Sequence, residues 1–301
     1  TYDSFNLEWG PGPKIEKAFE EVCECDVKFV TAGDGAALLA KVKLEGKKTK
    51  ADVVLGLDSN VLQEARKTNL FSENSLEAKL DLPIEWEDRT FLPYDWGYFA
   101  FVFDTNKIKE VPRSFKELIN SDLRLVIQDP RSSTPGLGLL LWIEKIFGRD
   151  SKRIWEKLSD NIVTVTPGWS EAYGLFLEGE VDGVLSYTTS PAYHIVVEKD
   201  FSKRAAIFKE GHLIQVEVAA MVAGSSKKKL AKSFMSFLIS NQVQSIIPTT
   251  NWMYPAKKPK SALPEAFNVK IGKEKAIYLD PNTVPALRSK ALEVWKRELN
   301  K

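Results

Sequence analysis

The chain has 301 residues, with 42 basic and 41 acidic side chains and a formal net charge of +1. This near-neutral balance argues against bulk electrostatic attraction to nucleic acid or to an anionic membrane surface. Hydrophobic residues make up 44% and charged residues 28%, which is typical of a globular chain, and the length suffices for two lobes. No apolar run approaches the roughly 20 residues that span a bilayer.

Helical and extended patterns alternate over the first third of the chain. Ile15, Phe19 and Val22 recur at helical spacing, and Asp34 and Gly46 bound a second helix. The alternation predicts an α/β fold with a mainly parallel sheet. In chain order, we expect a helix over 10–24, a strand over 26–33, a helix over 33–47, a strand over 51–58 and a helix over 59–71.

Two long extended segments, at about 91–103 and 213–222, bracket a middle block with its own strands and helices. This predicts one lobe inserted into another and joined to it by two crossing strands. Residues 1–95 and 214–301 then form lobe 1, and residues 96–213 form lobe 2. The expected helices are 114–120, 131–148, 151–160, 169–180, 189–199, 227–240, 241–248 and 288–299, and the expected strands of the middle block are 124–130, 161–167 and 182–188.

Metal-ligating side chains are scarce. Cys23 and Cys25 are the only cysteines, and His194 and His212 are the only histidines. A zinc site built on the cysteines would need two further Cys or His residues nearby, so we assign no metal ligand. The cysteines are expected near the start of a strand, either as free thiols or as a local disulfide.

Clusters of polar and aromatic residues follow predicted strands, each at the start of a helix. Ligands of open α/β sheets bind beyond the carboxyl ends of strands, where helix N-termini present free N–H groups. In one cluster, residues 132–134 could contact an anionic or hydroxyl group, although an ordinary N-cap explains them as well. Asp34, between two glycines, is either an N-cap or a carboxylate for a cationic ligand group. The clusters are YDSFNLEWGPGP, AGDGAALL, GLDSN, QDPRSSTPGLG, TPGWSEAYG and SYTTSPAYH.

Five aromatic side chains lie in predicted loops rather than in the periodic stripes of a core. Any one of them could cover a core as readily as a ligand. Together with a carboxylate they predict a pocket for a flat cation, because aromatic faces attract cations by roughly 0.5–2 kcal/mol per contact. The five are Trp9, Trp169, Tyr187, Tyr193 and Trp252, whereas Trp142, Trp155 and Trp295 fall within helical patterns and are interpreted as packing.

The sequence offers little for catalysis. It contains no Gly-x-Ser-x-Gly elbow, no P-loop, no complete dinucleotide fingerprint and no His close to a Ser or Cys nucleophile. With no nucleophile and base to name, we expect a binding protein rather than an enzyme.

Several long motifs resemble the thiamine-binding periplasmic proteins of bacterial thiamine ABC transporters. They include WGYFAFVFD, QDPRSSTPGLGLLLW, GWSEAYGLFL, LSYTTSPAYH and IPTTNWMYP, and the resemblance thins around residues 72–90 and after about 256. It implies a two-lobed type II periplasmic binding protein fold with the two crossing strands as hinge. It also implies capture of thiamine, and of its mono- and diphosphate, in a cleft between the lobes, for delivery to a membrane permease.

We expect a monomer, because nothing in the sequence demands a homo-oligomer, and we expect no cofactor. The resemblance implies a location in the periplasm or another extracytoplasmic compartment. We find no signal peptide or lipid anchor in this sequence. A signal peptide is removed from an exported protein by processing, so an exported origin stays open.

The resemblance assigns ligand-binding residues by motif. Trp169 and Tyr193 match the aromatic pair that stacks thiamine, and Asp34 matches the carboxylate that meets the aminopyrimidine. A phosphate could meet the helix start in RSSTPG or the one in SYTTS. Further pocket positions match Tyr2, Trp9, Ser133, Tyr187 and Trp252.

Other ligands and one enzyme class stay open as alternatives. Ferric-ion-binding proteins share the architecture but use two adjacent tyrosines, whereas Tyr187 is followed by Thr188. A polyamine or a quaternary amine would also suit aromatic rings and one carboxylate. An enzyme that processes the thiamine pyrimidine would share the fold, but it would need an activated Cys or a carboxylate pair in its cleft.

Overall fold

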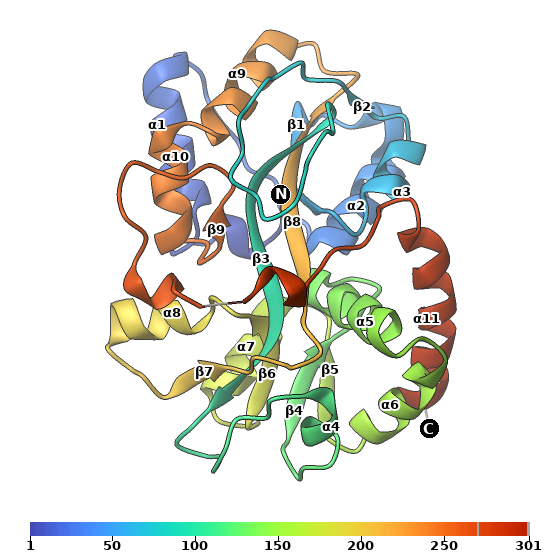
Figure 1. Cartoon of the computed structure of the whole chain (residues 1–301). Coiled ribbons are helices and arrows are strands. Elements are labelled where there is room, and N and C mark those ends of the chain that lie inside the picture. Colours follow the sequence, from blue (N-terminus) through green and yellow to red (C-terminus); the bar gives the residue numbers. More distant parts are fainter. Residues whose placement is uncertain (270, 300–301) are drawn as a thin grey trace. The chain divides into compact units, whose positions relative to one another are not determined.

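The computed structural model describes residues 1–269 and 271–299 and divides into two compact units (Figure 1). Unit 1 comprises Thr1–Trp96 and Val216–Glu265, and unit 2 comprises Gly97–Gln215 and the segment from Ala266 onward. Strands β3 (Phe91–Asp104) and β8 (His212–Val222) each begin in one unit and end in the other. The two long crossing strands predicted from the sequence are therefore confirmed.

The C-terminal segment belongs to unit 2, so its assignment to lobe 1 within 214–301 is wrong from Ala266 onward. Helix α11 (Val284–Leu299) packs against α5 (Thr134–Phe147) and α6 (Ser151–Leu158), as the red and green helices of Figure 1 show. Trp295 is buried in this packing. The spacing of apolar residues shows that a helix has a buried face but does not show which helices cover it, so sequence alone could not place α11.

Unit 1 contains pairs of antiparallel strands together with helices. Strand β1 (Val53–Asp58) and the short β2 (Phe71–Ser72) pair antiparallel with β8, and β9 (Tyr254–Pro255) pairs antiparallel with β3. The predicted mainly parallel sheet is wrong here, because β8 re-enters unit 1 in the direction opposite to β1. The helices are α1 (Gly12–Cys23), α2 (Gly35–Glu45), α3 (Leu62–Lys67), α9 (Lys228–Leu238) and α10 (Asn241–Ile246).

Residues 26–33, predicted as a strand, are not assigned to one, so that prediction is wrong. Backbone hydrogen bonds join them to the first residues of the chain, from Thr1 N to Val30 O at 2.9 Å and from Ala32 N to Thr1 O at 3.1 Å. These hydrogen bonds hold the segment in place, although it does not form a regular strand ladder.

The two cysteines form a local disulfide between Cys23, the last residue of α1, and Cys25. Glu24 between them adopts a φ of 50°, which ends the helix in the left-handed region. Of the two states left open by the sequence, the structure has the disulfide, and it lies at a helix end.

Unit 2 contains the parallel part of the fold. Strands β4 (Leu125–Gln128), β5 (Ile162–Thr166) and β6 (Gly183–Tyr187) lie in the order β6-β4-β5 and are parallel, and β3 runs antiparallel beside β6. Short strands β7 (Lys203–Ala205) and β10 (Ala276–Ile277) pair with β3 and β8. The remaining α-helices are α4 (Phe115–Leu118), α7 (Trp169–Leu177) and α8 (Pro191–Tyr193), which continues as the π-helical turn η4 (His194–Glu198).

Short 3-10 turns connect these elements; they are Ser4–Asn6, Gly46–Lys48, Gly148–Asp150, Ile247–Thr249, Glu265–Phe267 and Lys273–Lys275. In the described part of the chain, none of the helices combines the length and the apolar character required to cross a membrane.

Two glycines let α5 approach the strands of unit 2 closely. A Cβ at Gly136 would lie 2.4 Å from the backbone oxygen of Gln128, and one at Gly138 would lie 2.3 Å from the ring of Phe99. Because no side chain fits at these positions, the first turn of α5 sits directly against the end of β4. The helix start that carries Ser133 is thereby fixed at the carboxyl edge of the sheet.

Candidate ligand-binding site

The carboxyl ends of the parallel strands of unit 2 carry four of the predicted site residues. Ser133 follows β4, Trp169 follows β5, and Tyr187 ends β6 shortly before Tyr193. Because neighbouring parallel strands point the same way, their carboxyl ends share one edge of the sheet. The structure thus brings four residues from three separate motifs to one edge, and their contacts with a ligand stay a prediction.

Trp169 is the first residue of α7, and its partly buried ring is held on two sides. The indole stacks on the ring of Tyr173, with centroids 4.8 Å apart and planes at 27°. Its Nε1–H donates a hydrogen bond to Ser186 Oγ at 2.8 Å. It also packs against the buried cluster that includes Phe176 and Val184. A ring anchored in this way presents a fixed aromatic surface.

The other three residues at this edge differ in accessibility. Tyr187 and Tyr193 are both partly exposed, and the ring of Tyr187 stacks on Phe99 with centroids 5.2 Å apart. Burial and then the neighbouring Glu198 carboxylate raise the pKa of Tyr193. Ser133 is fully buried at the N-cap position of α5, where its side chain makes no capping hydrogen bond.

Three predicted residues of unit 1 lie on segments that the structure links. Asp3 N donates to the carbonyl of the glycine before Asp34 at 2.8 Å, so the start of the chain lies beside that helix start. The Tyr2 hydroxyl lies 3.1 Å from Asn251 Oδ1, next to Trp252. The ring of Tyr2 fills the space above Gly56, whose φ is 101°, and a Cβ there would lie 2.3 Å from it.

Asp34, Trp252 and Trp9 keep exposed surface. Asp34 stands at the N-cap position of α2, as predicted, but its side chain does not cap the helix. Trp252 adopts a φ of 56°, and a non-glycine residue in this region costs about 1 kcal/mol or more unless its surroundings hold it there. Trp9 lies in the turn after Ser4–Asn6 and is 50% exposed.

A buried polar cluster in unit 1 was not predicted from the sequence. Glu217 Oε2 lies 3.0 Å from the Tyr2 hydroxyl and 2.5 Å from the Tyr94 hydroxyl, and Asn251 Nδ2 donates to Asp95 Oδ2 at 2.6 Å. Burial raises the pKa of Glu217 to about 7. Burial, and then the charge of Glu217, raise the pKa of Asp95 well above its usual value. The signal available in the sequence was two acidic residues inside otherwise apolar strands.

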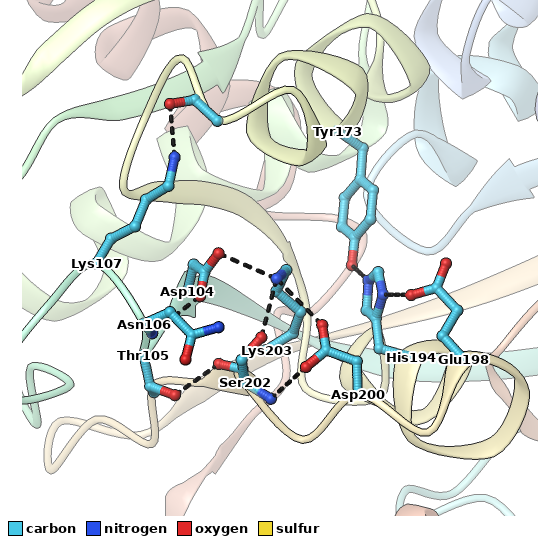
Figure 2. Close-up of polar contacts among 11 residues, drawn as sticks. Asp104, Thr105, Asn106, Lys107, Tyr173, His194, Glu198, Asp200, Ser202 and Lys203 are labelled. Carbon is cyan, nitrogen blue, oxygen red and sulfur yellow. Dashed lines mark hydrogen bonds and ion pairs between the residues drawn. The ribbon is translucent and has the colours of Figure 1, made fainter.

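A second missed group lies behind Trp169 in unit 2. The Tyr173 hydroxyl lies 2.9 Å from His194 Nε2, and His194 Nδ1 lies 2.6 Å from Glu198 Oε2 (Figure 2). Both Tyr173 and His194 are buried. The sequence carried two weak signals: Tyr173 follows Trp169 by one helical turn, and His194 directly follows Tyr193.

His194, Glu198 and Asp200 also bring three potential metal-ligand atoms within 4.8 Å of one another. Lys203 Nζ lies 3.2 Å from Asp200 Oδ2 and 3.0 Å from Asp104 Oδ2, so Asp200 is already paired with a lysine (Figure 2). The hydrogen bond to Glu198 occupies His194 Nδ1. We therefore interpret the group as a hydrogen-bond and ion-pair network.

Comparison with known proteins agrees with this geometry. Residues 48–275 match the family described as bacterial extracellular solute-binding protein. The chain is 51% identical to the thiamine-binding periplasmic protein of Escherichia coli (strain K12), over 100% of this chain and 92% of that protein. It is 50% identical to a solved structure described as periplasmic thiamin binding protein, with a TM-score of 0.96 over 100% of this chain and 95% of that one.

A more distant structure, iron-bound HitA from Pseudomonas aeruginosa, is 20% identical with a TM-score of 0.77, over 96% of this chain and 95% of that one. Similarity at that level shows the fold alone. The chain therefore belongs to the bacterial extracellular solute-binding protein family and has the two-lobed type II periplasmic binding protein fold that the motifs predicted.

Proposed function

We propose that the chain is a periplasmic solute-binding protein that captures thiamine and delivers it to the permease of an ABC transporter. Thiamine joins a flat aminopyrimidine to a thiazolium ring with a permanent positive charge. The observation that carries the proposal is the fixed ring of Trp169, which rests on Tyr173 and is anchored through Ser186. Aromatic faces bind flat rings and cations. The relatives named as thiamine-binding proteins support thiamine among the flat cations.

Each predicted residue has a role in this proposal. Trp169 and Tyr193 stack on the ligand, and the partly exposed Asp34 carboxylate accepts a hydrogen bond from the amino group of the pyrimidine. The remaining proposed contacts are Tyr2, Trp9, Ser133, Tyr187 and Trp252.

Thiamine mono- and diphosphate are proposed as further ligands. Of the two helix starts suggested for a phosphate, the one at α5 is favoured because α5 has 14 residues, whereas α8 has three and the π-helical turn that continues it has five. A longer helix presents a larger positive potential at its N-terminus. The proposal includes a monomeric protein without a cofactor of its own.

Titration calorimetry with thiamine tests the proposal on the wild type and on one variant in each unit. We expect one-to-one binding that weakens by about five- to thirtyfold in Trp169→Ala, since the loss of a stacked ring under a cation costs roughly 1–2 kcal/mol. Asp34→Ala is expected to weaken binding by about tenfold through loss of one charge-assisted hydrogen bond. Glu171→Ala, exposed on α7 two residues after Trp169, is the matched control and should bind as the wild type does.

A protein that does not bind thiamine would overturn the proposal. If neither thiamine nor its phosphates give heat or raise the unfolding temperature, the proposed ligand is wrong. Ferric ion, polyamines and quaternary amines would then be titrated into the same protein. Conversion of thiamine to a product during the titration would instead show an enzyme.

A further inference from the structure

One network of side chains in unit 2 runs from Trp169 to Tyr193, the two rings that we expect to stack on the ligand. Trp169 stacks on Tyr173, and the Tyr173 hydroxyl lies 2.9 Å from His194 Nε2. His194 Nδ1 lies 2.6 Å from Glu198 Oε2 (Figure 2). Glu198 in turn interacts with the side chain of Tyr193. Rings on two separate elements, α7 and the end of α8, are thus joined through three intervening side chains.

The Glu198 carboxylate defines the direction of its hydrogen bond with His194. A carboxylate only accepts, so His194 Nδ1 carries the proton that it donates to Glu198. In a neutral imidazole the other nitrogen then accepts, and the Tyr173 hydroxyl donates to Nε2. His194 is 0% exposed and Tyr173 is 7% exposed, so water does not compete strongly for these bonds. The buried part of the network therefore holds both side chains in one orientation.

At Glu198 the network reaches the surface, where the side chain is 42% exposed. Its carboxylate lies beside the phenol of Tyr193, whose pKa is raised by burial and then by this charge. A negative charge at this place does two things. It restrains the Tyr193 side chain, and it favours a cation on the face of that ring.

We propose that His194 and Glu198 are positioning residues, which orient the rings of Trp169 and Tyr193 before the ligand arrives. The inference rests on the stacking role given to these two rings in the proposed function. Rings that are already ordered lose less conformational entropy on binding, so pre-organisation increases affinity without any new contact to the ligand.

The exposure of Glu198 separates this role from a purely structural one. Half-exposed carboxylates contribute little to folding stability, so Glu198→Gln should leave the unfolding temperature nearly unchanged. Tyr173→Phe keeps the ring beneath Trp169 and removes only the hydroxyl that contacts His194. Glu178→Gln is the matched control, because Glu178 is exposed just after α7 and lies outside the network.

The experiment combines two measurements on the full chain. Calorimetry gives the thiamine Kd of the wild type, Glu198→Gln, Tyr173→Phe, the double variant and Glu178→Gln. The ¹⁹F spectrum of ligand-free protein labelled with 5-fluorotryptophan reports the surroundings of Trp169, whose resonance is assigned by its loss in Trp169→Phe.

Each network variant is expected to weaken thiamine binding by about three- to tenfold, the size expected when one neutral hydrogen bond is lost, as in Tyr173→Phe, or when one hydrogen bond loses its charge, as in Glu198→Gln. The double variant should weaken it by less than the product of the two, since coupled residues are not additive. The Trp169 resonance should shift or broaden in both network variants, and the control should match the wild type in both measurements.

The outcomes keep the two proposals distinguishable. If the wild type binds thiamine and the network variants bind equally well, the positioning role is wrong and the proposed function stands. If binding weakens while the Trp169 resonance stays unmoved, the effect is not one of ring orientation, and the positioning role is again wrong. If the wild type does not bind thiamine, the proposed function fails. In that case an unmoved resonance overturns the positioning role, and a shifted one supports it for Trp169.

Discussion

Replacing the buried Glu217 with Gln is expected to stabilise the protein at alkaline pH relative to the wild type. Glu217 is 7% exposed, and its Oε2 lies within hydrogen-bond distance of the hydroxyls of Tyr2 and Tyr94. The side-chain oxygen of Gln can accept both of these hydrogen bonds without carrying a charge. The variant thus removes the ionisation of the side chain and keeps its contacts.

The size of the effect follows from the pKa. Burial raises the pKa of Glu217 from 4.5 to about 7. Because each tenfold change in proton affinity is worth about 1.4 kcal/mol, ionisation of this carboxyl in the folded protein costs about 3 kcal/mol. A raised pKa gives stability that is complete below pH 4.5 and is lost as the pH rises to about 7. Burial and then the charge of Glu217 raise the pKa of Asp95. The substitution removes that charge, which also favours the variant at alkaline pH.

Urea unfolding followed by tryptophan fluorescence, from pH 4.5 to pH 8.5, measures the difference between the variant and the wild type. Groups that titrate equally in both proteins cancel in this difference. The difference in the free energy of unfolding should rise by about 3 kcal/mol in favour of Glu217→Gln as the pH increases. Glu21→Gln, an exposed position on α1, should give a flat difference. A flat difference for Glu217→Gln as well would refute the argument from the buried carboxyl.

Three other perturbations test the packing, the acid stability and the disulfide. Gly136→Ala places a Cβ 2.4 Å from a backbone oxygen and should cost about 1–3 kcal/mol, whereas Gly174→Ala, with nothing within 4 Å, should gain up to about 1 kcal/mol. Equal shifts of the two thermal unfolding temperatures would contradict this. Burial lowers the pKa of His212 to about 4, so its contribution to stability is present above pH 6.5 and is lost as the pH falls to 4. His212→Gln should therefore flatten the acid limb of the stability curve by about 3 kcal/mol, and a parallel limb would argue against it. Reduction of the Cys23–Cys25 disulfide, which closes a very short loop, should lower the free energy of unfolding by less than about 2 kcal/mol, and a larger loss in denaturant titrations would show that α1 depends on it.

Local signals in the sequence were sufficient for most helices, many strands and the placement of site residues along the chain. Asp34 and Gly46 flank α2 as predicted, because helix ends are set by the conformations that these residue types favour. Trp169 begins α7 directly after a Pro-Gly pair for the same reason. The long motifs led to the family because they carry several specific residues in a fixed order.

The networks behind the site residues could not be read from the sequence. Tyr94 and Glu217 are 123 positions apart, and Tyr173 and His194 are 21 apart. Their meeting depends on which strands and helices become neighbours, and a period of 2 or 3.6 residues carries no information on that choice. A buried polar side chain in an apolar strand signals that a partner exists, but not which one.

By itself, the sequence determined most helices, the longer strands including the two crossing ones, the family and the residues proposed to contact a ligand, because these depend on local preferences and on motifs. Only the tertiary structure decided that β8 runs antiparallel to β1, that α11 packs on α5 and α6, and that Tyr173, His194 and Glu198 contact one another next to Trp169. Those features arise from contacts between distant segments, whose energies come from burial and hydrogen bonding once the chain has folded.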